Sequence, residues 1–319
     1  MANELARSKQ LHIGQDVTDD MINPENMKLL KRYVRDMQMR ELSPKSIYSY
    51  DCDIKAWFRY IYKEQYNQCI KDLTEDDIEE MIFMCKEFGN NTERIKRRLS
   101  SISAFYKFLR RKKEISENPC EFIARPKKGL PVVVQTFLTQ EQYQTIKDKL
   151  KEYGDLQLRT YVQLSISTMA RVNAISNIMW EQIDFENRTI DDVLEKEGKI
   201  VTLFFSEEVK ELLLELKAER EKNGITVPYV FITKYGGEYK KAEVGALSEW
   251  TKKVGEMIGI PSLHSHDWRH SGAQLMSLAG CQIEIISSLL NHAGLDVTKN
   301  HYLRQDKSKM QREKDKYSL

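Results

Sequence analysis

The sequence predicts a mainly helical protein with a small β-sheet, an α+β chain organised in two domains. Its 319 residues exceed the roughly 250–300 at which a single hydrophobic core stops growing. Apolar residues recur at helical spacing along most of the chain. One stretch, residues 183–205, instead has short β-type segments separated by polar turns. Apolar residues make up 41% of the chain, which is enough for real cores.

The first domain is expected over residues 23–117, after a loose polar arm at residues 1–22. Asn23-Pro24 and Ser43-Pro44 are helix-start signals, in which an N-cap side chain precedes a proline. Thr74 and Asp77 resemble a capping box with Asp in place of Glu. Apolar stripes follow each start, and the fourth and most basic helix carries Ile95, Leu99, Ile102, Phe105, Tyr106 and Leu109. Four amphipathic helices therefore form a small all-helical domain.

A change of composition marks the expected linker at residues 118–136. It holds three prolines and a glycine without helical periodicity, which favours extended chain. The second domain is expected over residues 137–319, and Thr139 with Gln142 is its first capping-box candidate. Its β-type segments are Thr189-Ile190 and residues 200–205, and helical periodicity returns from Glu207.

The net charge of +2 conceals a strongly basic segment. Residues 91–128 contain twelve Lys or Arg and four Asp or Glu, a local charge of +8, so the rest of the chain sums to −6. Such a segment indicates an anionic partner, with nucleic acid first, although a solvated helix face has the same composition. The candidate DNA contacts are Arg94, Lys96, Arg97, Arg98, Lys107, Lys127 and Lys128.

Other classes are excluded by pattern. No apolar run approaches the roughly 18 residues of a membrane helix, and the first ten residues lack the apolar segment of a secretory signal. The five cysteines are scattered without a CxxC pair, which indicates reduced thiols and a cytoplasmic location.

Histidines crowd into the last 60 residues, where five of the six lie: His264, His266, His270, His292 and His301. Zinc could bind the first three, but no HExxH motif supports a metal, and we expect none. His266 and Arg269 share a helix face at spacing i, i+3. An arginine fork grips phosphate, and a neighbouring imidazole can hydrogen-bond it or move a proton.

Several short motifs, in this order, resemble those of the tyrosine recombinase, or phage integrase, family. The sequence from His266 to His270 resembles H-x-L-R-H, and Leu290-Asn291-His292 resembles L-G-H with Tyr302 ten positions on. The upstream counterparts are Thr168 to Val172 for the T-G-L-R-I/V box, Lys196 to Lys199 for K-G-x-K, Leu42 to Phe58 for the start of the core-binding (SAM-like) domain, and Asn118-Pro119 with Arg125 to Lys127 for its exit.

The resemblance implies double-stranded DNA as substrate, cleavage through a 3′-phosphotyrosyl intermediate, and no cofactor. Arg171 and Arg269 would hold the phosphate, and His266 and His292 would hydrogen-bond it or take a proton. Tyr302 would be the nucleophile. Lys196 would protonate the leaving oxygen, with Lys199 as the alternative. A recombinase would act as a tetrameric synapse, in the cytoplasm at the nucleoid, and would come from a bacterium, a phage or a mobile element.

Departures from the family pattern keep a second hypothesis open. Met169-Ala170 stands where Gly-Leu is usual, Trp268 replaces Leu, and Asn291 replaces Gly. Ala174 occupies the position of an acid that normally braces the active site. The alternative is therefore a DNA-binding regulator, such as a phage-type repressor, that acts as a monomer or dimer on the same fold without strand exchange.

Overall fold

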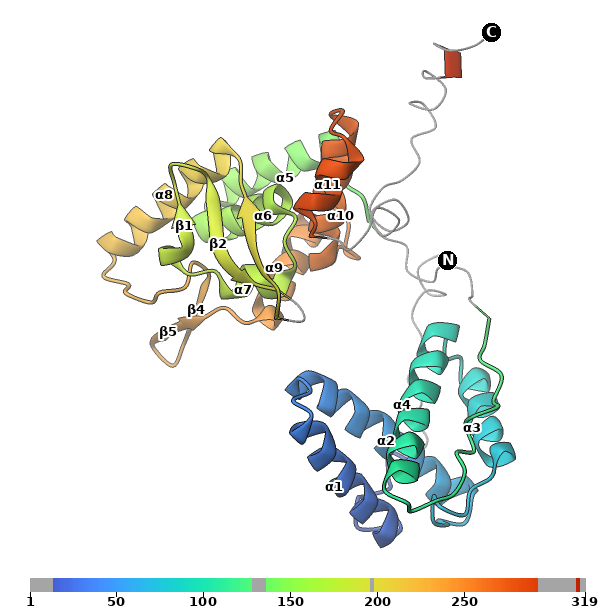
Figure 1. The fold of residues 1–319 in the computed structure, drawn as a ribbon. Coiled ribbons are helices and arrows are strands. Elements are labelled where there is room, and N and C mark those ends of the chain that lie inside the picture. The colour runs from blue at the N-terminus through green and yellow to red at the C-terminus, as the bar shows by residue number, and fades with distance from the viewer. Residues whose placement is uncertain (1–13, 128–135, 196–197, 292–313, 316–319) are drawn as a thin grey trace. The chain divides into compact units, whose positions relative to one another are not determined.

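The computed structural model describes residues 14–127, 136–195, 198–291 and 314–315 (Figure 1). Its internal contacts divide the chain into two units, Met1–Val134 and Gln135–Leu319. The division falls within the expected linker. The first part of that linker is not free chain, because Cys120 and Ile123 are buried in the core of the N-terminal unit.

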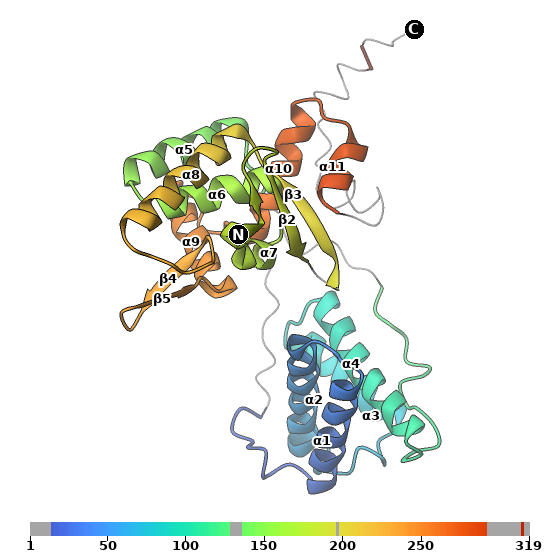
Figure 2. The ribbon, with the colours of Figure 1, turned by 60° about the vertical axis from the view of Figure 1, so that its left-hand side comes forward.

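The described part of the N-terminal unit contains four helices, each beginning at a side chain that caps it. They are α1 (Pro24–Met39), α2 (Pro44–Glu64), α3 (Glu75–Glu87) and α4 (Thr92–Arg111). The two predicted Asx/Ser-Pro starts and the Thr74–Asp77 capping box are confirmed. Aromatic side chains fill the core, where Trp57 packs edge-on against Tyr106 at 5.5 Å. Figure 2 shows α1 alongside α2.

The C-terminal unit is built mostly from helices around one buried helix. Its elements are α5 (Gln140–Tyr153), α6 (Leu156–Thr168), α7 (Val172–Asn177), the 3-10 turn η1 (Trp180–Gln182), α8 (Glu207–Lys222), α9 (Val244–Met257), α10 (Ser265–Leu278) and α11 (Ile283–Leu289). Helix α6 contacts α5, α7, α8 and α10. The backbones of α6 and α10 can approach closely because Gly272 has no Cβ. A Cβ at this position would lie 2.3 Å from the Ile166 carbonyl oxygen.

The predicted β-region forms an antiparallel three-stranded sheet in the order β1-β2-β3, made of β1 (Ile183–Asp184), β2 (Thr189–Leu194) and β3 (Ile200–Phe204). A second hairpin, β4 (Ile232–Tyr235) with β5 (Glu238–Lys241), was not predicted. Its residues are mostly exposed on both faces, so they lack the apolar alternation by which a strand is recognised. Gly236 and Gly237, both with positive φ, make its turn.

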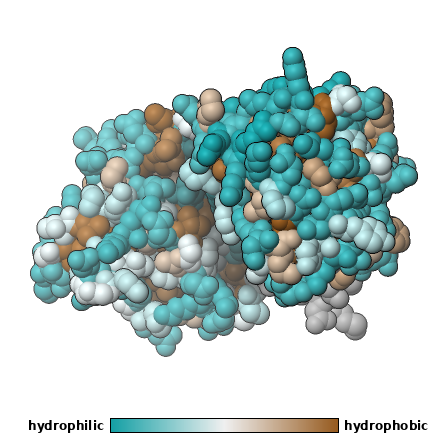
Figure 3. All heavy atoms as spheres, turned by 90° about the horizontal axis from the view of Figure 1, so that it is seen from below, coloured by the Kyte–Doolittle hydropathy of each residue, from teal (hydrophilic) through white to brown (hydrophobic). Residues whose placement is uncertain are grey.

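The face of the molecule seen in Figure 3 is largely hydrophilic. In the view of Figure 3, apolar side chains form small patches separated by polar ones. Across the described residues, no helix has the length and apolar character needed to cross a bilayer.

Candidate active site and nucleic-acid interface

The two predicted phosphate-binding arginines lie on different elements of the C-terminal unit and face one carboxylate. Arg171 is the N-cap residue of α7, and Arg269 lies in the first turns of α10. The Arg171 guanidinium forms an ion pair with Glu195, and Nη1 of Arg269 lies 3.9 Å from the Glu195 carboxylate. The structure therefore brings together two members of the predicted set around an acid that was not predicted.

Arg269 also connects two segments of the backbone. Its Nη1 donates to the Met169 carbonyl oxygen at 2.8 Å, and its Nη2 donates to the Leu290 carbonyl oxygen at 2.6 Å. These carbonyls precede Arg171 and His292 in sequence by two residues each. The Arg269 side chain is only 1% exposed, whereas that of Arg171 is 33% exposed. Arg269 thus links the C-terminal ends of α6 and α11, whereas the Arg171 guanidinium keeps part of its surface exposed.

Glu195 directly follows β2, next to the turn of the β2–β3 hairpin, which carries the predicted general acid. Its backbone N–H donates to the Lys199 carbonyl oxygen at 2.8 Å, so the two residues are opposite each other on the hairpin. The Glu195 side chain is 3% exposed. Sequence reasoning missed this residue. The available signal was an acid next to Lys196 in a chain that lacks the usual acid at position 174.

His266 lies in the first turn of α10, with its ring 4.7 Å from that of His270 in an edge-to-face arrangement. Its pKa is lowered from 6.5 to about 4, first by the burial of its ring and then by the positive charges of Arg269 and Arg171. The ring keeps one side exposed to solvent. The lowered pKa makes His266 neutral at neutral pH and able to accept a hydrogen bond or a proton.

Neighbouring side chains fix the start of α10. The Asp267 carboxylate accepts the His264 N–H at 2.8 Å and the Thr136 N–H at 3.3 Å. Burial raises the pKa of Asp267. The Trp268 indole donates to the Thr251 hydroxyl at 3.0 Å in the core, which gives the replacement of the usual Leu a polar partner.

Two of the residues that differ from the family motifs have a left-handed backbone conformation. Met169, the C-cap of α6, has φ of 53°, and Asn291 has φ of 53°. Glycine adopts this conformation without strain, and asparagine tolerates it better than most residues. The usual Gly at these two positions is thus explained by backbone shape. Met169 offsets its strain by burying its side chain in a small cluster with Ala273, Ile286 and Leu290.

Part of the predicted site lies outside the described residues. This holds for the candidate catalytic residues Lys196, His292 and Tyr302, and for the candidate DNA contact Lys128. In the part of the chain that is described, no three His, Cys, Asp or Glu side chains are grouped to hold a metal ion.

The basic helix α4 presents some of its predicted DNA contacts and buries another. Arg97, Lys107 and, beyond the helix, Lys127 are exposed, while Arg94 and Lys96 are half-buried. Arg97 pairs with Asp53 at 2.8 Å. Arg98 was expected to belong to this set, but it is 4% exposed. The helical period turns Arg98 inward beside Ile95 and Leu99, towards the Cys85 thiol, and burial lowers its pKa. Its prediction as a DNA contact is corrected accordingly.

A polar hollow of about 520 Å³ extends this basic surface along the C-terminal half of α4. Lys107, Arg110, Arg111 and Arg125 line it. Arg110 pairs with Glu121 at 3.0 Å, and Arg111 pairs with Asp36 at 2.5 Å. Lys107 has no ion pair among the described residues, so its charge is available to a phosphate.

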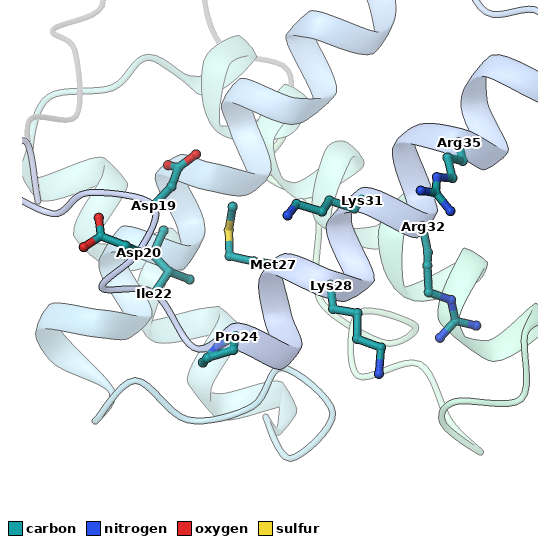
Figure 4. Close-up of a pocket in the computed structure, with 9 residues that line it drawn as sticks. All are labelled: Asp19, Asp20, Ile22, Pro24, Met27, Lys28, Lys31, Arg32 and Arg35. Carbon is teal, nitrogen blue, oxygen red and sulfur yellow. The ribbon is translucent and has the colours of Figure 1, made fainter.

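A second hollow, of about 620 Å³, follows α1 in the same unit (Figure 4). Lys28, Lys31, Arg32 and Arg35 come from one side of α1, and Ile22 and Met27 contribute apolar surface. Arg32 is engaged by Glu114 at 2.5 Å. This hollow belongs to the N-terminal unit, whereas the arginine site belongs to the C-terminal unit.

Residues 136–309 match the family model described as "Phage integrase family". The chain belongs to the phage integrase family. Residues 30–113 match its "Phage integrase, N-terminal SAM-like domain". The motif resemblance and the predicted fold class are thereby confirmed.

Relatives are similar along most of their length. The tyrosine recombinase XerC of Lactobacillus delbrueckii subsp. bulgaricus is 28% identical over 269 residues, which cover 81% of this chain and 88% of the relative. That of Leptospira interrogans is 25% identical, with 88% and 89% covered.

Solved structures show the same fold at lower identity. A lambda integrase dimer bound to a COC′ core site is 19% identical with a TM-score of 0.66, covering 84% of this chain and 95% of that one. A lambda integrase tetramer bound to a Holliday junction is 18% identical with a TM-score of 0.68, covering 87% and 77%.

Proposed function

We propose that this chain is a site-specific DNA recombinase that cuts and rejoins double-stranded DNA through a 3′-phosphotyrosyl intermediate. The observation that carries the proposal is the meeting of Arg171 and Arg269 on one carboxylate, with a neutral His266 in the same turn as Arg269. Family membership and the names of the relatives, tyrosine recombinases, support it.

In the proposed reaction, the Tyr302 hydroxyl attacks the scissile phosphorus and loses its proton to a neutral imidazole, that of His266 or His292. Two guanidinium groups stabilise the negative charge that develops on the non-bridging oxygens. The bond from phosphorus to the 5′-oxygen breaks as a lysine donates a proton to that oxygen. Attack by a 5′-hydroxyl of another strand on the phosphotyrosine reverses these steps and joins the strands without ATP.

The hairpin lysine that donates this proton is Lys196 in our proposal, and one observation favours Lys199 as a second candidate. Residues that lie opposite each other on antiparallel strands extend their side chains to the same face. Lys199 is opposite Glu195, whose carboxylate reaches both arginines. A substrate with sulfur in place of the bridging 5′-oxygen separates the candidates, because a thiolate leaves without a proton. Only the variant that lacks the true acid regains its cleavage rate on this substrate.

We propose duplex DNA as the partner, contacted by Arg94, Lys96, Arg97, Lys107, Lys127 and Lys128, and a tetramer as the active assembly. The solved neighbours named as a DNA-bound dimer and a tetramer on a Holliday junction support this assignment. We place the protein in the cytoplasm, at bacterial, phage or mobile-element DNA. The regulator hypothesis is not favoured, because a carboxylate does reach the arginine pair although position 174 lacks one.

The test uses a nicked duplex that traps the covalent product, with the full chain and its Tyr302→Phe variant. The substitution removes one hydroxyl and no charge. Cleavage is expected to fall below detection, and the dissociation constant for DNA is expected to change by less than about threefold, because phosphate contacts carry the affinity. If wild type and Tyr302→Phe bind a verified cognate site equally and neither forms a covalent product, the regulator hypothesis is favoured instead.

A further inference from the structure

We propose that Glu195 is the positioning residue for the Arg171–Arg269 pair, in place of the acid that the family usually carries at position 174. The inference rests on the proposed function for its catalytic consequence. Its structural part, that one hairpin carboxylate holds both guanidinium groups, is tested independently below.

The contacts of Glu195 are shared between the two arginines. Oε2 pairs with Nη1 of Arg171, and Oε1 lies 3.9 Å from Nη1 of Arg269. Oε1 is buried and has no hydrogen-bond partner among the described residues. A carboxylate removed from water in this way is costly unless it is paired with positive charge. The positive charges of Arg171 and Arg269 therefore hold the Glu195 carboxylate in place, and the carboxylate in turn holds the two guanidinium groups.

The backbone of the hairpin explains why the acid at position 195 points inward. The Glu195 N–H is bonded to the Lys199 carbonyl oxygen, which fixes the last paired residue before the turn. From the end of β2 towards the turn, exposure alternates: as whole residues, Val193 is 2% exposed, Leu194 is 57% exposed and Glu195 is 7% exposed. This alternation is that of a strand with one face on the core. The inward face at position 195 is occupied by a charge because the arginines lie there.

Position 174 cannot supply the same support. Ala174 is 1% exposed in the first turns of α7 and belongs to the hydrophobic core. Without an acid, two guanidinium groups close together repel each other, and the exposed one is free to turn into solvent. A carboxylate between them offsets this repulsion and restricts the rotamers of Arg171. Since small displacements of a phosphate-binding group slow catalysis strongly, the position of the carboxylate affects rate more than affinity.

The same geometry allows one opposing role. A carboxylate on two arginines resembles a phosphate, so Glu195 could occupy the phosphate site and compete with DNA. The two roles predict opposite effects of removing the charge. A positioning residue, once neutralised, slows cleavage and leaves binding nearly unchanged. A competing residue, once neutralised, tightens DNA binding and does not slow cleavage.

The experiment compares Glu195→Gln, Glu195→Asp and the wild-type chain in single-turnover cleavage of the trapping duplex. Asp192→Asn is the matched control, because it removes the same charge from an exposed residue of the same strand. We expect Glu195→Gln to cleave about 10- to 100-fold more slowly, with a DNA dissociation constant within about threefold of wild type. Glu195→Asp retains the charge and should recover part of the rate, and the control should match wild type. Equal losses for Gln and Asp would overturn the proposal, as would tighter binding by Glu195→Gln.

A double-mutant cycle with Arg171→Lys excludes a merely structural effect on the hairpin. If Glu195 acts through Arg171, the losses in rate are less than multiplicative, whereas independent damage multiplies. A multiplicative result contradicts the proposal.

A final readout does not depend on cleavage. In the free protein, the Nε–H resonances of Arg171 and Arg269 report how firmly each guanidinium is held. Both are expected to shift in Glu195→Gln and to stay unchanged in Asp192→Asn. Unshifted resonances overturn the positioning role even if the chain is an active recombinase. If the resonances shift in Glu195→Gln but the wild-type chain does not cleave DNA, the positioning role stands and the proposed function is refuted.

Discussion

The imidazole of His266 has a charge state set by its neighbours. In an unfolded chain its pKa is near 6.5, and in the folded protein it is lowered to about 4 by burial and by Arg269 and Arg171. The unfolded state therefore binds more protons than the folded state between these two values. Stability from the neutral imidazole is complete above pH 6.5 and is lost as the pH falls towards 4.

We predict that an NMR titration of the free protein places the His266 midpoint well below 6.5. Chemical unfolding should show the free energy of unfolding falling more steeply between pH 6.5 and 4 in wild type than in His266→Gln, because the variant removes the titrating group. A midpoint at or above 6.5, or equal slopes for the two proteins, contradicts this account of the site's electrostatics.

At the scale of the element, α4 shows what helical periodicity can and cannot resolve. Its existence and its apolar stripe followed from the sequence, because Ile95, Leu99 and Ile102 recur at helical spacing. The fate of Arg98 did not, because it borders that stripe and its burial depends on α3 supplying Cys85 beside it. The hairpin β4–β5 was missed for a related reason, since its exposed strands carry no burial pattern.

The contrast between an exposed and a buried cation of α4 gives a prediction about DNA binding. Replacing Lys107 by Ala removes one phosphate contact, so the slope of log affinity against log salt should decrease by about one. Arg98→Met should leave the slope unchanged, because its guanidinium is buried. Lys222→Ala, an exposed charge on α8, is the control. Affinity for DNA measured from low to physiological salt checks all three variants. An unchanged slope in Lys107→Ala would mean that this face of α4 is solvated and does not contact DNA.

At the scale of the whole molecule, the order of the motifs along the chain predicted the family and the two-part architecture. It also predicted that Arg171 and Arg269 meet, which they do at Glu195. The support between them was not predictable from one sequence. It depends on a hairpin that returns residue 195 to the ends of α7 and α10, and no local spacing encodes that return. The alanine at position 174 was therefore interpreted as the loss of a supporting acid, whereas the β2–β3 hairpin supplies a carboxylate at Glu195.

The central claim is that this chain joins itself to DNA through Tyr302. The most direct measurement is mass spectrometry of the proteolysed product formed with the nicked cognate duplex in metal-free buffer. We predict one nucleotide-linked peptide that contains Tyr302 with a phosphodiester on its phenolic oxygen, and no such peptide from Tyr302→Phe. A covalent link at another residue, or no link on DNA that the protein demonstrably binds as its cognate site, would contradict the account.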